Sequence, residues 1–265
     1  MPWCTRDGVR LYYEVCGEGP DMVMLHANPC DHRMWMYQIA SFSRRFRVIA
    51  PDMRGYGRSD KVEQPFGFSA LVEDAFAICD AEGVTSAVVA GASMGSKIAF
   101  SMAIERPELC RALIQVGGSA YRGGSYDGRA AGYLGPDLAV YRAQHLSELF
   151  APGFTGTPRG RYLCNVTLDD SAVLSGKALS ALFRSFDGVD LANRVAAIKV
   201  PVLIVNGAHD NSLEGGRKTA SLIGDARHAV IDNAGHLCIL EEPEAFDALA
   251  VAFLQENGLY PELKG

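Results

Sequence analysis

The sequence has no continuous apolar stretch of about 18 residues, so we expect no membrane-spanning helix. Its first residues, Met-Pro-Trp-Cys-Thr-Arg-Asp-Gly, lack the apolar segment of an export signal. Positive charge is also scarce, because 25 Lys and Arg stand against 31 Asp and Glu, which gives a net charge of −6. This balance argues against binding to nucleic acid or to an anionic membrane surface. We therefore expect a cytoplasmic protein that acts on a small-molecule substrate, and the sequence carries no signal for its oligomeric state.

Closely spaced cysteine pairs are missing as well. The chain has 7 cysteines, an odd number, and none are spaced as Cys-x-x-Cys. This pattern disfavours a disulfide framework or a zinc cluster, so we expect reduced thiols and no metal. Apolar residues make up 48% and charged residues 21% of the 265 residues, which is typical of one globular domain or of one domain with an insertion.

Short apolar runs recur along the chain and are separated by stretches with helical spacing. Because the runs are nearly continuous rather than alternating, they predict strands buried on both faces, as in a parallel sheet. A helix with one apolar stripe is predicted over residues 243–257, with Gly258 just past its end. Residues 8–15 predict an additional antiparallel strand. The fold class is therefore α/β, a mostly parallel, doubly wound sheet. The predicted parallel strands are 22–25, 46–50, 87–90, 112–116, 202–205 and, more weakly, 229–231.

Residues 119–186 interrupt this alternation and contain no clear strand. A structureless loop of that length is improbable in a compact domain. We interpret the segment as a helical cap inserted into a core of residues 1–118 and 187–265, with helices near 138–150 and 171–183. Deleting such a cap is expected to change selectivity more than chemistry.

The motif with the clearest chemical meaning is Gly91-Ala92-Ser93-Met94-Gly95. A predicted strand leads into this G-x-S-x-G pattern and a predicted helix, 94–105, leaves it. Such a sharp strand-to-helix turn exposes the serine hydroxyl, and only small residues fit two positions before and after it. Ser93 is therefore the candidate nucleophile.

A serine hydroxyl needs a base, and the base needs an acid that orients it. Strand 202–205 leads to Asp210, and His236 lies in the loop after the last strand. The order Ser93, Asp210, His236 is the order found in hydrolases with a nucleophile elbow. Asp232 is the rival acid, and His26, His32, His145, His209 and His228 are the other histidines.

Acyl transfer also requires donors for the developing oxyanion. The N–H of Met94, directly after the nucleophile, is one candidate. The loop after the first parallel strand supplies the other, for which we name the N–H of Asn28. An ordinary Asn-Pro turn is the alternative interpretation of that loop.

Together these motifs resemble the α/β-hydrolase superfamily. The matching segments are residues 26–29, 52–59, 91–95, 207–210 and 235–236. Within the superfamily, residues 31–35 and the stretch from 46–49 to the elbow are similar to 3-oxoadipate enol-lactonases and small carboxylesterases. The resemblance implies an α/β-hydrolase fold with a helical cap and a structural role for the turn 52–59.

The function expected from these residues is hydrolysis of an ester or lactone through an acyl-enzyme, with no cofactor. The same triad also fits hydrolysis of a carbon–carbon bond in a ring-fission diketone. Two further alternatives are a ligand-sensing receptor and a cofactor-free perhydrolase. The aromatic residues and arginines of the cap, including Arg142, favour a small acidic or aromatic substrate. The residues that we expect to contact it are Trp35, Tyr121, Arg122, Tyr126, Tyr141 and His145.

Overall fold

One sheet organises the computed structural model, which describes residues 2–169 and 173–263. Its order is β1-β2-β4-β3-β5-β6-β7-β8. Strands β3 to β8 run parallel to one another, whereas β2 pairs antiparallel with both β1 and β4. The strands are β1 (Trp3–Arg6), β2 (Val9–Cys16), β3 (Asp21–Leu25), β4 (Arg47–Pro51), β5 (Ala87–Ala92), β6 (Cys110–Val116), β7 (Val202–Gly207) and β8 (Ala226–Ile231).

This topology confirms the mostly parallel sheet and the antiparallel strand near its start. Strand β1, which is four residues long and lies at the edge of the sheet, was not predicted. Its sequence Trp-Cys-Thr-Arg is too short to show a period, and its pairing with β2 is what makes it a strand.

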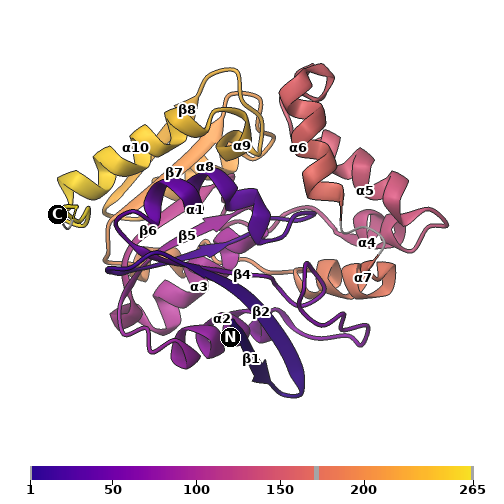
Figure 1. The fold of residues 1–265 in the computed structure, drawn as a ribbon, viewed down its shortest axis with the longest axis horizontal. Coiled ribbons are helices and arrows are strands. Elements are labelled where there is room, and N and C mark those ends of the chain that lie inside the picture. The colour runs from indigo at the N-terminus through magenta and orange to yellow at the C-terminus, as the bar shows by residue number, and fades with distance from the viewer. Residues whose placement is uncertain (1, 170–172, 264–265) are drawn as a thin grey trace.

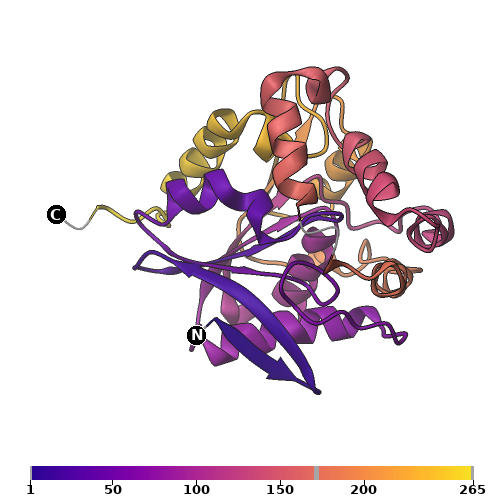
Figure 2. The same ribbon diagram turned by 45° about the vertical axis from the view of Figure 1, so that its right-hand side comes forward.

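Helices cover both faces of the sheet, with α1 and α10 on one side and α2 and α3 on the other (Figures 1 and 2). Along β3, Met22 and Met24 belong to the core on the α1 and α10 side. Val23 and Leu25 belong to the core on the α2 and α3 side. These helices are α1 (Met36–Phe42), α2 (Phe68–Ala81), α3 (Met94–Glu105) and α10 (Pro243–Glu256), and α8 (Leu213–Ala220) and α9 (Cys238–Glu241) complete the set around the sheet.

The remaining helices follow β6 and precede β7, and Figure 1 shows them at the right-hand side, opposite the C-terminus. They are α4 (Asp127–Tyr133), α5 (Leu138–Ser147), α6 (Pro158–Leu168) and α7 (Gly176–Ser185). The expected helices near 138–150 and 171–183 correspond to α5 and α7, although residues 171 and 172 lie outside the described residues.

Helices α4 and α6 were not predicted. The start of α6 does carry a signal, because Thr157 accepts a hydrogen bond from the N–H of Gly160 and Pro158 occupies the first turn. Among the described residues, no helix combines the length and the apolar character needed to cross a membrane.

Candidate active site

Ser93 stands at the junction of β5 and α3 in a left-handed backbone conformation, with φ of 53°. Its N–H donates to the carbonyl of Val116 on the neighbouring strand at 2.7 Å. Such a backbone is costly for a residue with a side chain and persists only where the surroundings enforce it. The junction therefore holds the Ser93 side chain above the end of the sheet.

The flanking glycines show how tightly this turn is packed. A Cβ at Gly91 would lie 2.5 Å from the carbonyl oxygen of Gly95, and one at Gly95 would lie 2.4 Å from that of Leu25. Both positions leave no room for a larger residue, as the G-x-S-x-G pattern implies.

His236 and Asp210 lie side by side at the ends of two neighbouring strands. The Nδ1 atom of His236 lies 2.7 Å from Oδ1 of Asp210. Asp210 also accepts hydrogen bonds from the hydroxyl of Ser212 at 2.8 Å and from the side-chain amide of Asn206 at 2.7 Å. Gly117 leaves space for the imidazole, because a Cβ there would lie 2.6 Å from Cε1 of His236.

The surroundings of Asp210 keep it ionised. Burial on its own raises the pKa of this carboxyl, but the imidazole of His236 and the hydrogen bonds from His236, Ser212 and Asn206 lower it to about 2. A fixed carboxylate at Nδ1 leaves Nε2 of His236 as the free, basic nitrogen. Among the described residues no hydrogen bond joins His236 to the Ser93 hydroxyl, and such contacts commonly tighten only when substrate binds.

The rival acid and three of the other histidines do not line the site. Asp232 is exposed to solvent. His26 is fully buried and accepts a hydrogen bond from the N–H of Met53, and His228 contacts the side chain of Asn206. His209 is exposed although it precedes Asp210.

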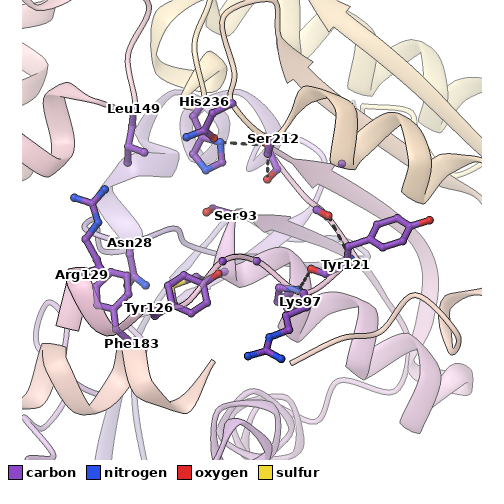
Figure 3. Close-up of a pocket in the computed structure, with 18 of the residues that line it drawn as sticks. Asn28, Ser93, Lys97, Tyr121, Tyr126, Arg129, Leu149, Phe183, Ser212 and His236 are labelled. Carbon is purple, nitrogen blue, oxygen red and sulfur yellow. Dashed lines mark hydrogen bonds between the residues drawn. The ribbon is translucent and has the colours of Figure 1, made fainter. Parts of the chain in front are cut away.

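A cavity of about 650 Å³ connects Ser93, His236 and Asn28 (Figure 3). This volume is in the range of sites for small organic molecules. The residues that line it come from the loops after the sheet strands, from α3 and α8, and from the segment that contains α4 to α7. They are Asn28, Ser93, Met94, Lys97, Gly117, Ser119, Tyr121, Arg122, Gly123, Gly124, Tyr126, Arg129, His145, Leu149, Phe183, Asn211, Ser212, Gly215, Lys218 and His236.

Four of the residues expected to contact substrate line this cavity: Tyr121, Arg122, Tyr126 and His145. Two do not, and those expectations are wrong for this cavity. Trp35 is fully buried and packs against Phe246 of α10, on the far side of the sheet from α3. Tyr141 packs edge-on against Tyr133, where it joins α4 to α5.

The expectation that Arg142 favours an acidic substrate is also wrong, because this side chain does not line the cavity. Its side chain is 0% exposed, and its guanidinium donates to the carbonyls of Pro29 and Thr167. The sequence alone does not distinguish a buried arginine from one that faces a ligand, because the hydrogen-bond partners of Arg142 are backbone carbonyls far away in the chain.

Several lining residues were missed, and Lys97 is the most informative of them. It lies one turn after Ser93 on α3 and is 6% exposed. Its ammonium donates to the carbonyls of Tyr121 at 2.7 Å and Val189 at 3.3 Å. Burial lowers its pKa to about 8, although the charge of Asp190 opposes this shift. The spacing of Lys97 from Ser93 is the signal that predicts its place on the site.

The candidate oxyanion donors lie on the same cavity. Met94 is the first residue of α3, so its N–H has no acceptor within the helix. Asn28 lies in a turn closed by a hydrogen bond from the N–H of Cys30 to the carbonyl of Ala27, at 3.0 Å. The Asn28 side chain is 4% exposed, and neither of its polar atoms has a hydrogen-bond partner among the described residues. A buried, unpartnered amide on a cavity wall is costly unless a ligand satisfies it.

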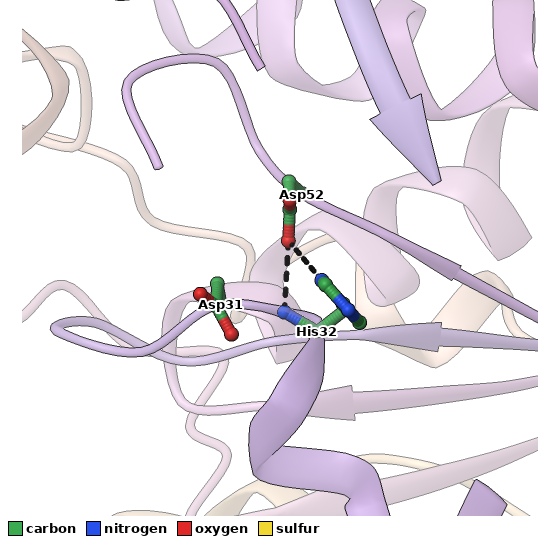
Figure 4. A group of neighbouring side chains, drawn as sticks. All are labelled: Asp31, His32 and Asp52. Carbon is green, nitrogen blue, oxygen red and sulfur yellow. Dashed lines mark hydrogen bonds and ion pairs between the residues drawn. The ribbon is translucent and has the colours of Figure 1, made fainter. Parts of the chain in front are cut away.

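One group of potential metal ligands lies outside this cavity, next to the end of β4. It consists of Asp31, His32 and Asp52 (Figure 4). Oδ1 of Asp52 accepts hydrogen bonds from the backbone N–H and the ring of His32, and Oδ2 accepts one from the N–H of Arg58. Asp31 forms a two-pronged ion pair with Arg33. Because these carboxylates already accept hydrogen bonds within the chain, the cluster fixes the turn rather than offering a built metal site.

A strand-turn-helix serine beside an aspartate–histidine pair is the arrangement found in α/β-hydrolases. Residues 20–243 match the family model described as alpha/beta hydrolase fold. The chain therefore belongs to the α/β-hydrolase family and is a hydrolase-type enzyme.

Individual relatives agree with this assignment. A 3-oxoadipate enol-lactonase of Acinetobacter baylyi is 28% identical, and the alignment covers 95% of each chain. A pimeloyl-[acyl-carrier protein] methyl ester esterase of Yersinia enterocolitica is also 28% identical, over 94% of this chain and 98% of the esterase. The crystal structure of an enol-lactonase from Burkholderia xenovorans superposes with a TM-score of 0.89 at 25% identity, covering 96% of this chain and 100% of the enol-lactonase. This similarity confirms the expected resemblance to enol-lactonase-like members.

Proposed function

We propose that this chain is a serine hydrolase that cleaves an ester or lactone of a small organic substrate through an acyl-enzyme. The observation that carries the proposal is the strained Ser93, which shares one cavity with His236 while Asp210 fixes the far side of the imidazole. The names of the enol-lactonase and methyl ester esterase relatives support this reaction class.

In the proposed reaction His236 takes the proton of the Ser93 hydroxyl as Oγ attacks the substrate carbonyl. The N–H groups of Asn28 and Met94 hold the negative oxygen of the tetrahedral intermediate. As the intermediate collapses, His236 gives its proton to the leaving alkoxide, and the acyl group stays on Ser93. A water molecule then loses a proton to His236 and attacks the acyl-enzyme. The bond between the acyl carbon and Oγ of Ser93 breaks, Oγ takes the proton back from His236, and the acid is released. Asp210 stabilises the imidazolium in both steps.

Residues 119–186 act as the cap in this proposal, with residues 1–118 and 187–265 as the core. The cap contributes Tyr126, Arg129, His145 and Phe183 to the cavity wall, and it separates the reacting atoms from bulk water. Its aromatic residues pack on one another. The rings of Tyr133 and Phe183 are stacked with their centroids 5.2 Å apart. The ring centroid of Tyr141 lies 5.0 Å from that of Tyr133, and that of Tyr126 lies 6.0 Å from that of Phe183.

The charges on the wall support a substrate that carries a negative group. Lys97, Arg122, Arg129 and Lys218 line the cavity, and no Asp or Glu is among the described lining residues. This local excess of positive charge contrasts with the net charge of −6 of the whole chain. A cavity with one sign of charge attracts ligands of the opposite sign.

The test combines a substrate panel with active-site labelling. The panel contains p-nitrophenyl esters, enol-lactones and ring-fission dienoates, and a fluorophosphonate probe reports the reactive serine. We expect turnover of an ester or lactone, labelling of Ser93, and loss of both in Ser93→Ala with the fold intact. Turnover in Ser93→Ala, or an unlabelled Ser93 in folded protein, would refute the nucleophile. Turnover of dienoates alone would favour the carbon–carbon hydrolase instead.

A cytoplasmic location and a small-molecule substrate as partner complete the proposal. Among the residues that the structure describes, no disulfide involves Cys4, Cys16, Cys79, Cys110, Cys164 or Cys238, which supports a reducing compartment.

A further inference from the structure

Helix α5 lies between two loops that the proposed reaction uses. Its buried positions Arg142, His145 and Leu146 follow the spacing of one helical face, and Leu149 continues this face just beyond the helix. Arg142 contacts the loop that contains Asn28. Residues 149–151 contact the loop that contains His236.

At the first contact, Arg142 holds the backbone of the oxyanion loop. Its Nε and Nη2 atoms donate to the carbonyl of Pro29 at 3.0 and 2.8 Å, and Nη2 also donates to the carbonyl of Thr167 at 2.9 Å. Pro29 directly follows Asn28, so the position of its carbonyl constrains the peptide that carries the Asn28 donor. Two hydrogen bonds from one planar guanidinium fix direction as well as distance.

At the second contact, the backbone after α5 is bonded to the histidine loop. The carbonyl of Leu149 accepts from the N–H of His236 at 2.8 Å and from that of Leu237 at 3.3 Å. The approach is close, because a Cβ at Gly235 would lie 2.6 Å from the backbone nitrogen of Ala151.

The carboxylate of Glu241 adds two hydrogen bonds to this second contact. Glu241 is 2% exposed, and its carboxylate accepts hydrogen bonds from the N–H of Gly235 at 2.7 Å and from the N–H of Ala151 at 2.8 Å. One buried side chain therefore bridges the residue before His236 and the segment that follows α5. Two charge-assisted hydrogen bonds from backbone donors offset part of the cost of burying the carboxylate.

We propose that α5 sets the spacing between the oxyanion loop and the histidine loop, with Arg142 and Glu241 as positioning residues. This inference rests on the proposed serine hydrolase function. Neither side chain lines the cavity, so each acts through the loop that it holds. The physical reason is that transition-state stabilisation is sensitive to geometry, and a displacement of about 1 Å can lower a rate about a hundredfold. The inserted segment would then be part of the catalytic apparatus as well as a wall of the cavity.

The first test compares Arg142→Met with Arg142→Lys on the ester that the wild type turns over best. We expect Arg142→Met to lower kcat about tenfold to a hundredfold with KM nearly unchanged, because the Asn28 donor acts on the transition state. Arg142→Lys keeps a donor for the Pro29 carbonyl but loses the second prong, so it restores part of the rate. Arg161→Met changes an exposed arginine of α6 and serves as the matched control, with wild-type rates expected.

A trifluoromethyl ketone provides a readout that a purely structural role would not change. It adds reversibly to the serine, and the oxyanion of the adduct uses the same donors as the transition state. We expect its affinity for Arg142→Met to fall by about the same factor as kcat. If Arg142→Met is less stable but keeps wild-type kcat and inhibitor affinity in the folded state, Arg142 only stabilises the fold and the inference is overturned.

The second test uses Glu241→Gln, which has nearly the same shape but accepts only one of the two N–H groups. We expect kcat to fall about tenfold, whereas Glu244→Gln on the exposed start of α10 keeps the wild-type rate. An unchanged kcat in folded Glu241→Gln would remove Glu241 from the inference. The proposed function fails in a different way, namely when the wild type hydrolyses no ester or lactone of the panel.

Discussion

Asp210 has a role that a single atom change can test. Its carboxylate fixes the tautomer of His236, so Asp210→Asn presents an amide where Nδ1–H needs an acceptor. We expect kcat to fall about a thousandfold to ten-thousandfold while KM changes little, as measured by steady-state kinetics. Asp232→Asn is the matched control, since Asp232 is exposed, and it should be neutral. The opposite pattern would make Asp232 the acid.

Lys97 tests whether the charge of the cavity selects the substrate. We compare p-nitrophenyl hexanoate with the p-nitrophenyl monoester of adipic acid, which has the same chain length and ends in a carboxylate. The wild type should prefer the anionic ester, and Lys97→Met should lose about tenfold or more of that preference while it still hydrolyses the neutral ester. Lys199→Met, an exposed lysine that does not line the cavity, controls for a general change in charge. Equal preference in wild type and Lys97→Met would contradict this role.

Among the elements, the β5–α3 junction is the part of the site that sequence describes best. The strand, the turn and the helix that starts at Met94 all follow from adjacent residues, and α3 has the predicted bounds. The His236–Asp210 contact was also expected, because both residues follow neighbouring parallel strands, whose carboxyl ends meet at one edge.

The junction also yields a stability prediction. Gly91→Ala places a methyl group 2.5 Å from a backbone oxygen, so the turn must open. We expect a loss of about 1–3 kcal/mol in the free energy of unfolding, measured by urea denaturation. In Gly128→Ala on α4 the added Cβ meets nothing within 4 Å, and this variant should be neutral or gain up to about 1 kcal/mol. Equal effects of the two substitutions would show that the junction is not tightly packed.

Residues 119–186 were harder to predict because their contacts are distant in sequence. Tyr141 was expected to contact the substrate, but its side chain packs between two helices. Arg142 was expected to favour an acidic substrate, but its guanidinium donates to a carbonyl that lies 113 residues away in the sequence. Trp35 was misassigned for a related reason, since a tryptophan after a loop fits a core as well as a ligand wall. The expectation that cap deletion mainly alters selectivity stays a prediction, and α5 should be retained in such an experiment.

At the scale of the whole molecule, His145 links the cavity to the pH dependence of folding. Burial lowers its pKa from about 6.5 to about 3, and the positive charges of Arg129, His236 and Arg142 add to this shift. Its hydrogen bond with the hydroxyl of Tyr133 is 2.7 Å long. The folded protein therefore keeps His145 neutral at pH values where the unfolded chain protonates it.

The sign of the pH effect follows from this difference. Below pH 6.5 the unfolded state binds more protons than the native state, so the contribution of His145 to stability is lost as the pH falls toward 3. We expect the free energy of unfolding to fall by an amount on the order of a few kcal/mol over this range. His145→Gln should flatten the decline, and exposed His209→Gln should not. Equal slopes for His145→Gln and wild type would exclude His145 as the cause.

The two anchor points of α5 also limit how this enzyme can be re-engineered. A chimera that exchanges residues 119–186 for the corresponding segment of another hydrolase would import new walls for the pocket. Unless the donor segment brings its own equivalent of Arg142 and a backbone amide for Glu241, the graft would leave the buried Pro29 carbonyl without its Arg142 donors. The buried Glu241 carboxylate would keep only the N–H of Gly235. Substrate range and turnover would then change together, and recombination libraries would have to keep both anchors fixed to separate them.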